Sequence, residues 1–312
     1  MEWRYKMILC CGEALIDMLP RETTQGEQAF APYAGGAVFN TAIALGRLGA
    51  KPGFFCGLSQ DLFGELLVET LAASDVTTDL APRPDLPTTL AFVKLQNGQA
   101  TYTFYDKDTA LTSLRADALP AIGDDVNAMF FGGISLAEGP SADAFEALLT
   151  REAASRVTMI DPNIRPSFIK DRDSYVARIR RMMALSDIVK LSDEDLAWLE
   201  GAEDLQAMAQ AILARGTKLV LITQGAEGAT GFTANGSVFV PSQKVEVVDT
   251  VGAGDTFNAG VLYALQDAGL LTKEAIAQMG EADIKAALSM GARCAAVTVS
   301  RAGANPPRLS EL

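Results

Sequence analysis

The stretch Val248-Asp249-Thr250-Val251-Gly252-Ala253-Gly254-Asp255-Thr256-Phe257 places two glycines and an acid at the start of an alanine-rich helix predicted over 258–268. A helix N-terminus leaves backbone N–H groups without intrahelical partners, and glycine lets that backbone approach a ligand closely. These N–H groups and the helix dipole favour an anion such as a phosphate. An acid beside such a site repels the ligand unless it has a chemical task. The task that fits Asp255 is general base, taking a proton from a hydroxyl that attacks phosphorus. An ordinary helix start, with Asp255 as a first-turn acid, would read the same.

The composition limits the classes of function. The 312 residues are 49% hydrophobic and 21% charged, which indicates a globular protein with one large α/β domain or one domain plus a smaller element. The net charge of −13 argues against a nucleic-acid partner and an anionic membrane surface, so any phosphate site must be built locally. There is no histidine, which excludes Ser-His-Asp hydrolysis, Cys-His proteolysis and His-ligated zinc.

The cysteines and the N-terminus indicate a cytoplasmic protein. Four cysteines lie in apolar runs without CxxC spacing and are expected to be buried thiols in a reducing compartment: Cys10, Cys11, Cys56 and Cys294. The apolar run 7–11 is too short for a signal-peptide core, and no segment reaches the length of a membrane span.

Strand-like runs alternate with amphipathic helical patterns, which predicts a mostly parallel sheet with helices on both faces. The expected strands are 7–11, 52–56, 128–131, 156–160, 188–191 and 218–223. The expected helices are 38–48, 64–73, 142–153, 175–184, 193–199, 205–214 and, near the C-terminus, 282–299. There is no repeat and no clear linker, so a single domain is expected over 1–312.

One segment breaks the alternation. Residues 90–95 and 100–105 flank Asn97-Gly98, a strong hairpin signal, and a two-residue turn would pair Val93 with Tyr102 and Ala91 with Phe104. This register puts the apolar residues on one face, with Phe92 as the exception. A lone hairpin is barely stable, so strands 15–19 and 28–33 are expected to join it in a small projecting sheet. The sheet could cover a site, pair with a second subunit, or do both.

Other polar groups follow predicted strands or precede a helix. Asp17 and Asn40, with Gly35-Gly36 between them, could hold the hydroxyls of a polyol, although each also suits an ordinary turn. The stretch 161–166 follows a strand, where ligands bind in open α/β sheets, and its Arg165 could pair with a phosphate or form a surface salt bridge. The stretch 223–228 could pass under a nucleotide or be a plain hairpin turn. Neither a Walker A loop nor G-x-G-x-x-G after a strand is present.

Together these groups resemble the PfkB (ribokinase-like) family of carbohydrate kinases, in its fructokinase-like branch. The first family signature matches 35–42 and continues through 47–49 to Gly57, Asp61 and Gly64. The second, more specific signature matches 249–257. The resemblance covers the whole chain and implies a ribokinase-like fold, with a lid formed by segments of about 13–34 and 88–108.

The resemblance also implies a reaction, transfer of the γ-phosphoryl group of MgATP to a sugar hydroxyl, most readily fructose to fructose 6-phosphate. Asp255 would be the catalytic base, and the N–H groups of Gly252, Ala253 and Gly254 would form the anion hole. The sugar would be held by Asp17, Gly35, Gly36, Asn40 and Tyr105. The nucleotide side would be formed by Asn163, Arg165, Lys190, Thr223, Gly225 and Gly228. Mg²⁺ would bridge the ATP phosphates, and a monovalent cation, K⁺, could bind near carbonyls of Asp249, Val251 and 300–303. A homodimer through the lid could form.

Two positions depart from the family pattern. The Asn-x-x-Glu motif tied to Mg²⁺ reads Ser192-Asp193-Glu194-Asp195, and Asp195 has a shorter reach to metal-bound water than glutamate. After the lid hairpin the chain has Tyr105-Asp106 where many relatives have Tyr-Arg, and Asp106 would repel a substrate carboxylate. The alternatives are a kinase of the same fold for ribose, a nucleoside or 2-keto-3-deoxygluconate, and a sugar- or nucleotide-binding regulator without turnover.

Overall fold

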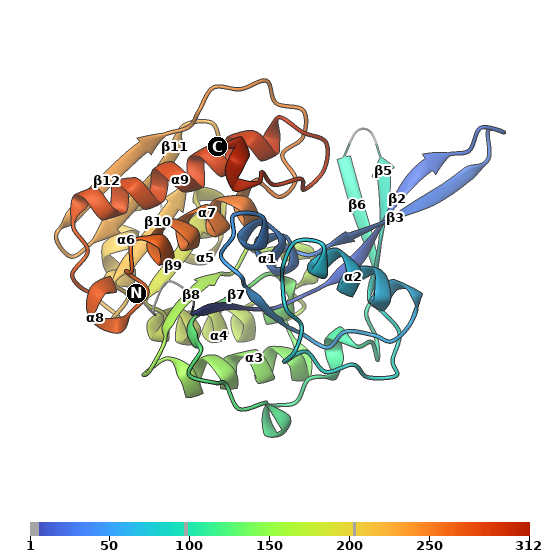
Figure 1. Ribbon diagram of the computed structural model, residues 1–312, viewed down its shortest axis with the longest axis horizontal. Helices are drawn as coiled ribbons and strands as arrows, with labels where there is room; N and C mark the ends of the chain where they lie inside the picture. Colours follow the sequence, from blue (N-terminus) through green and yellow to red (C-terminus); the bar gives the residue numbers. More distant parts are fainter. Residues whose placement is uncertain (1–5, 97–98, 202–203) are drawn as a thin grey trace.

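The computed structural model describes residues 6–96, 99–201 and 204–312. Its centre is an eight-stranded sheet, shown in Figure 1. In spatial order the strands are β12 (Gly236–Pro241), β11 (Gly228–Thr233), β10 (Leu219–Thr223), β9 (Ile188–Ser192), β8 (Val157–Asp161), β7 (Val126–Gly132), β1 (Met7–Cys11) and β4 (Gly53–Phe55). In this sheet the neighbouring strands β10, β9, β8, β7, β1 and β4 pair in parallel, whereas β11 and β12 pair antiparallel. The predicted mostly parallel sheet is confirmed.

Helices cover both faces of this sheet, as predicted. On one face lie α1 (Ala37–Arg47), α2 (Leu62–Ala72), α7 (Ala253–Asp267), α8 (Lys273–Ile276) and α9 (Glu281–Val299). On the other lie α3 (Gly139–Glu152), α4 (Arg172–Leu185), α5 (Asp193–Glu200) and α6 (Leu205–Leu213). Strand β1 shows this arrangement, since Ile8 packs against the first group of helices and Leu9 against the second. Because helices cover both faces of β1, its side chains are apolar on both faces.

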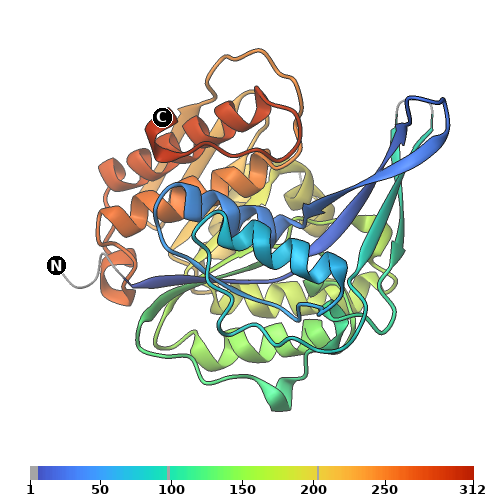
Figure 2. The same ribbon diagram turned by 45° about the vertical axis from the view of Figure 1, so that its right-hand side comes forward.

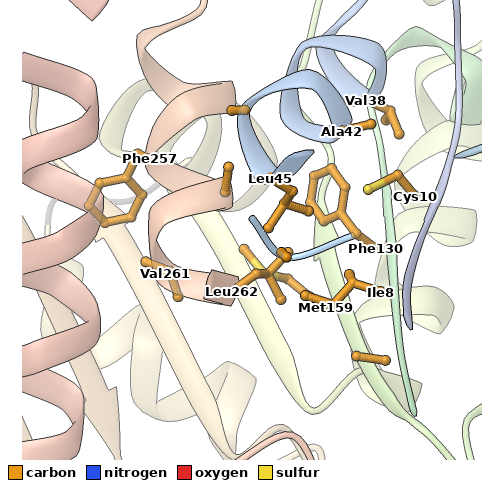
Figure 3. Close-up of a cluster of buried hydrophobic side chains, with 14 of the residues drawn as sticks. Ile8, Cys10, Val38, Ala42, Leu45, Phe130, Met159, Phe257, Val261 and Leu262 are labelled. Carbon is orange, nitrogen blue, oxygen red and sulfur yellow. The ribbon is translucent and has the colours of Figure 1, made fainter. Parts of the chain in front are cut away.

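The core between α1, α7 and the sheet fixes where the two helix N-termini lie (Figure 3). Leu45 of α1 and Leu262 of α7 lie over Phe130 and Met159 of the sheet, and Val38 lies farther from α7, beside Cys10. On its other side α7 packs against α9 at very short range, since a Cβ at Gly260 would lie 2.8 Å from the Cα of Gly291. Two facing glycines allow this approach, and any larger side chain would push α7 away from the site.

A second sheet projects from the body, as Figures 1 and 2 show. Its strand order is β3 (Gln28–Gly35), β2 (Leu15–Glu22), β5 (Leu90–Gln96) and β6 (Gln99–Tyr105). The predicted register is confirmed, with Val93 opposite Tyr102 and Ala91 opposite Phe104. The predicted turn at Asn97-Gly98 lies outside the described residues. We call this four-stranded sheet the lid.

The expectation of a single apolar lid face is incomplete. The strand pairing places Asp17, Ala91 and Phe104 on one face, the inner face, and Phe92 and Tyr105 on the other, the outer face. On the outer face Phe92 packs edge-on against Phe30, with ring centroids 4.9 Å apart, and against Tyr105 at 5.5 Å. The apparent exception to the pattern is therefore the centre of an aromatic cluster.

Two further expectations concern the whole chain. All four cysteines are free and buried, as predicted. Within the described ranges, no helix has both the length and the apolar character that a membrane crossing demands.

Candidate active site

Asp255 lies in the first turn of α7 and is only 7% exposed. Its Oδ2 accepts a hydrogen bond from Nδ2 of Asn40 at 2.9 Å, and its Oδ1 faces Nδ2 of Asn163 at 3.5 Å. Burial raises the pKa of Asp255 to about 7, and the negative charge of Asp161 adds to this rise. The Asn40 hydrogen bond and the Lys190 cation oppose it. The carboxyl therefore titrates near neutral pH, as a general base requires.

The predicted anion hole lies directly before Asp255. Gly252 is the N-cap of α7 with φ 78°, a left-handed conformation that favours glycine. A Cβ on Gly254 would lie 3.3 Å from Nζ of Lys190, so the lysine cation is close to the helix N-terminus. The N–H of Ala253 already donates to the carbonyl of Thr250 at 3.3 Å. The first-turn N–H groups and Lys190 thus make this end of α7 attractive to an anion.

The predicted sugar residues meet at the base of the lid. Asp17 on β2 and Gly35 at the end of β3 are in contact, because a Cβ on Gly35 would lie 2.5 Å from Oδ2 of Asp17. Gly36, with φ 116°, then starts α1 and leads to Asn40. Burial raises the pKa of Asp17 to about 6. Asn40 in turn donates to the carboxylate of Asp255, so α1 connects the end of β3 to the start of α7.

Tyr105 is not part of this group. It pairs with Leu90 in the strand register, which places it on the outer face of the lid, opposite Asp17. Its side chain is 60% exposed and its ring packs on Phe92. On the inner face, Phe104 contacts Phe168 with ring centroids 4.1 Å apart. Phe168 ends the short helix η5 (Pro166–Phe168), so this aromatic pair joins the lid to the body.

The predicted nucleotide residue Lys190 of β9 belongs to a buried polar cluster. Nζ of Lys190 pairs with Oδ2 of Asp161 at 2.9 Å, and both side chains are almost fully buried. Asn258 of α7 donates to the same oxygen at 2.7 Å. Burial alone would lower the pKa of Lys190, but the Asp161 carboxylate outweighs it and the pKa is raised. Lys190 therefore stays positively charged beside the anion hole.

The loop after β8 has an unusual backbone. Asn163 has φ 44°, which asparagine tolerates better than most residues, and its N–H donates to the carboxylate of Asp161 at 3.1 Å. Arg165 is exposed and donates to the carbonyl of Ile164 at 3.0 Å. The backbone turn directs Asn163 toward Asp255 and leaves Arg165 exposed at the protein surface.

The stretch 223–228 is the turn of the β10–β11 hairpin. The N–H of Gln224 donates to the carbonyl of Gly228 at 2.8 Å, and both Gly225 and Gly228 have positive φ. Thr223 pairs with Ser192 in the strand register and so lies at the same edge of the sheet as Lys190 and Asp161. The hairpin reading is confirmed, and it does not conflict with a nucleotide site at this edge.

Asp195 makes hydrogen bonds that hold the start of α5 and the loop after β8, and the sequence motif did not predict them. Its Oδ1 accepts from the N–H of Ile164 at 3.0 Å, and it forms a capping box with Ser192 at the start of α5. Burial and the charge of Asp161 raise its pKa. In the described part of the chain, no group of three or more acids or cysteines is placed to hold a metal ion.

The two segments expected to hold a monovalent cation lie together. Asp249 accepts from the N–H of Val251 at 3.1 Å through one oxygen and from the N–H of Gly303 at 2.9 Å through the other. The N–H of Val248 also donates to the carbonyl of Val299 at 2.8 Å. These contacts place the segment 249–251 next to the segment 300–303.

Sequence reasoning missed two buried polar residues at the site. Glu13 lies two residues after β1 and accepts a hydrogen bond from the N–H of Ala37 at the N-terminus of α1. Asn258 lies on the buried side of α7 and is 1% exposed. Asn258 could have been found from the sequence, because it is a polar residue on an otherwise apolar helix face. The sequence around Glu13 does not indicate which residues it contacts.

The chain is similar to known proteins over nearly its whole length. The family described as pfkB family carbohydrate kinase matches residues 5–311. A fructokinase from Rhizobium leguminosarum bv. trifolii is 59% identical over 275 residues, which are 88% of this chain and 84% of the relative. The structure of a Xylella fastidiosa fructokinase with bound ATP gives a TM-score of 0.89 at 32% identity, covering 98% of this chain and 97% of that chain. A Vibrio cholerae fructokinase double mutant, solved with fructose, ADP and a potassium ion, gives 0.83 at 27% identity, covering 96% of this chain and 94% of that chain.

Proposed function

This chain belongs to the pfkB family of carbohydrate kinases and is an ATP-dependent sugar kinase, and we propose that it converts fructose to fructose 6-phosphate with Asp255 as general base. The observation that carries the proposal is the position of Asp255. Its buried carboxyl, with a pKa of about 7, lies between an amide from the sugar side, Asn40, and one from the nucleotide side, Asn163. The choice of fructose rests on the fructokinase relatives.

The proposed chemistry is a single transfer. Ionised Asp255 takes the proton of the sugar hydroxyl while that oxygen forms a bond to the γ-phosphorus, and the bond from phosphorus to ADP breaks. The N–H groups of Gly252, Ala253 and Gly254 stabilise the charge on the moving phosphoryl group, together with the Lys190 cation. Ala253 would exchange its 3.3 Å contact to Thr250 for a phosphate oxygen.

On the sugar side, Asp17 and Asn40 would bind hydroxyl groups, and Gly35 and Gly36 would let the sugar approach the backbone. The inner face of the lid lies over this surface through the contact between Phe104 and Phe168. We do not assign Tyr105 a place beside the sugar, because it lies on the outer face. The lid would exclude water, so that ATP is not simply hydrolysed.

On the nucleotide side, the site would be formed by Asn163, Arg165, Lys190, Thr223, Gly225 and Gly228. Mg²⁺ fits this site as an ion carried by the ATP phosphates, because the described residues supply no carboxylate cluster of their own. Asp195 could hold one of its waters, although its Oδ1 is engaged with Ile164. The bound ion would neutralise phosphate charge. The adjoining carbonyls near Asp249 and Gly303 suit K⁺.

We extend the proposal to assembly and location. Phe30 and Tyr105 are 47% and 60% exposed on the outer face of the lid, and a homodimer through this face would bury them. A cytoplasmic location fits a consumer of ATP whose four cysteines are free. Sedimentation measures the oligomeric state of the wild type and of Phe30→Ser. If the lid forms the dimer interface, the wild type should be a dimer and the variant a monomer.

The function is tested by ADP release from purified protein with MgATP and a panel of fructose, ribose, glucose, adenosine and 2-keto-3-deoxygluconate. Rapid turnover with fructose alone is the expected result. The exposed acid Asp106 disfavours the sugar acid by repulsion. Preference for another sugar would overturn the substrate but not the kinase chemistry, and binding without ADP release for any sugar would favour a regulator.

A further inference from the structure

Glu13 is a buried carboxylate outside the residues that handle substrate. It follows β1 and is 2% exposed. Its Oε1 accepts from the N–H of Ala37 at 2.9 Å, and its Oε2 accepts from the N–H of Ser135 at 3.3 Å. Glu13 therefore joins the end of β1 to the start of α1 and to the loop after β7.

Glu13 replaces a missing helix cap. Gly36 is the N-cap residue of α1 and has no side chain to accept a hydrogen bond from the first turn. Such caps contribute to helix stability, and a negative charge near the N-terminus is favoured by the helix dipole. The carboxylate of Glu13 supplies both from a distant part of the chain.

Two glycines, Gly36 and Gly133, pack closely against Glu13. A Cβ on Gly36 would lie 2.7 Å from the carbonyl oxygen of Glu13, and one on Gly133 would lie 2.0 Å from its Oε1. Both glycines have positive φ, at 116° and 71°. No side chain larger than glycine fits at either position while Glu13 keeps its place, so the three residues form one built unit.

The position of α1 matters for catalysis through Asn40. The N–H of Asn40 donates to the carbonyl of Gly36 at 2.8 Å, and its side chain donates to Asp255 at 2.9 Å. A shift of the first turn of α1 would carry the amide away from the carboxylate. The charge of Glu13 makes a small contribution to the raised pKa of Asp255, after burial and the charge of Asp161.

We propose that Glu13 is a positioning residue, whose carboxylate fixes the first turn of α1 and thereby places Asn40 against Asp255. This inference rests on the proposed role of Asp255 as the base. The proposal predicts that loss of Glu13 lowers kcat/KM for the sugar and leaves KM for ATP nearly unchanged, because the predicted nucleotide residues do not lie on α1. A residue that only stabilised the fold would not distinguish the two substrates.

The test compares Glu13→Ala with Glu13→Gln and with Glu152→Ala. Glu152 is also a buried carboxylate, but it pairs with Arg156 at the end of α3, away from the described site. Glu13→Ala is expected to lower kcat/KM for the sugar about tenfold, the scale of one lost buried hydrogen bond. KM for ATP should change by less than about twofold. Glu13→Gln keeps one acceptor for Ala37 and should recover most of the loss, and Glu152→Ala should reduce only stability.

A double-mutant cycle identifies the route of the effect. If Glu13 acts through Asn40, Glu13→Ala should cost little further activity in the Asn40→Ala background. Hydrogen exchange at the start of α1, measured on the same proteins, should be faster in Glu13→Ala than in Glu13→Gln. Equal costs in both backgrounds, or unchanged exchange, would overturn the proposal. If Asp255→Asn retained full turnover, the assigned base would be wrong, whereas the exchange result would still report whether Glu13 fixes α1.

Discussion

Asn40 and Asp255 are 215 positions apart in the sequence, and the side-chain amide of the first donates to the carboxylate of the second at 2.9 Å. The bond joins the first turns of α1 and α7, whose packing is set by the core beneath them. The carboxylate is therefore oriented before a sugar binds. An oriented base loses little entropy during the reaction, which favours catalysis.

Replacing Asp255 by asparagine should abolish the base and keep the shape of the site. We expect kcat to fall at least about a hundredfold, with sugar and ATP binding changed only a few-fold. ADP release and calorimetry measure the two effects. Asp283→Asn is the matched control, since Asp283 is likewise the third residue of its helix, α9. Turnover close to wild type in Asp255→Asn would remove this residue from the chemistry.

Activity should rise with pH through about 7, because burial raises the pKa of Asp255 to about 7 and only the ionised form accepts a proton. Asn40→Ala removes a hydrogen bond that lowers this pKa, so the acidic limb of kcat/KM should move to higher pH. Thr41→Val is the control, because the Thr41 hydroxyl bonds the main-chain carbonyls of Ala37 and Asp255 and not the Asp255 carboxylate. A limb that stays in place in Asn40→Ala would contradict the assignment.

The same carboxyl should lower stability above neutral pH. Its pKa is about 7 in the folded chain, against an ordinary value of 3.8 for aspartate, so unfolding releases a proton between these two pH values. The folded state thus loses stability as the pH rises from about 4 to about 7, and the loss persists above. Asp255→Asn should melt at a higher temperature than the wild type at pH 8, and the difference should vanish below about pH 4. An equal difference at both pH values would refute this.

Lid closure should depend on the contact between Phe104 and Phe168. Phe168→Ala is expected to raise the ratio of sugar-independent ATP hydrolysis to sugar phosphorylation by roughly threefold or more, because water gains access to the phosphates. Phe239→Ala is the control, because it removes an exposed aromatic ring from β12, at the edge of the main sheet and outside the lid. The ratio is measured by comparing ADP release with and without fructose. No change in Phe168→Ala would mean that the lid closes by other contacts.

Lys190→Met should be both unstable and inactive. It leaves the carboxylate of Asp161 buried without its cation, which typically costs about 3–5 kcal/mol. The double variant Lys190→Met/Asp161→Asn removes both charges and should recover most of the melting temperature. It should not recover kcat, because the cation beside Gly254 is still missing. Recovery of activity in the double variant would limit Lys190 to a structural role.

The sequence predicted the large sheet well because its strands and helices follow local patterns. All six expected strands of the body and the register of the lid hairpin are confirmed. The helices begin and end within a few residues of the predicted bounds. These features depend on spacing that a short window contains.

The parts that were missed depend on contacts between distant segments. The role of Glu13 follows from its meeting with Ala37 and Ser135, which no local pattern encodes. The face of Tyr105 depends on pairing between β2 and β5, since a change of one residue in register would reverse it. Asp195 was expected to serve a metal, but its contact with Ile164 is visible only once α5 and the loop after β8 are side by side.

The central place of β1, between β7 and β4, has a consequence for synthesis. The predicted sugar-side residues Asp17 and Asn40 are synthesised before α7, which carries Asp255, and before its partner α9. A nascent chain that has α1 but not yet α7 therefore lacks the carboxylate that Asn40 contacts in the folded protein. The two halves of the candidate site come together only after α7 has been made.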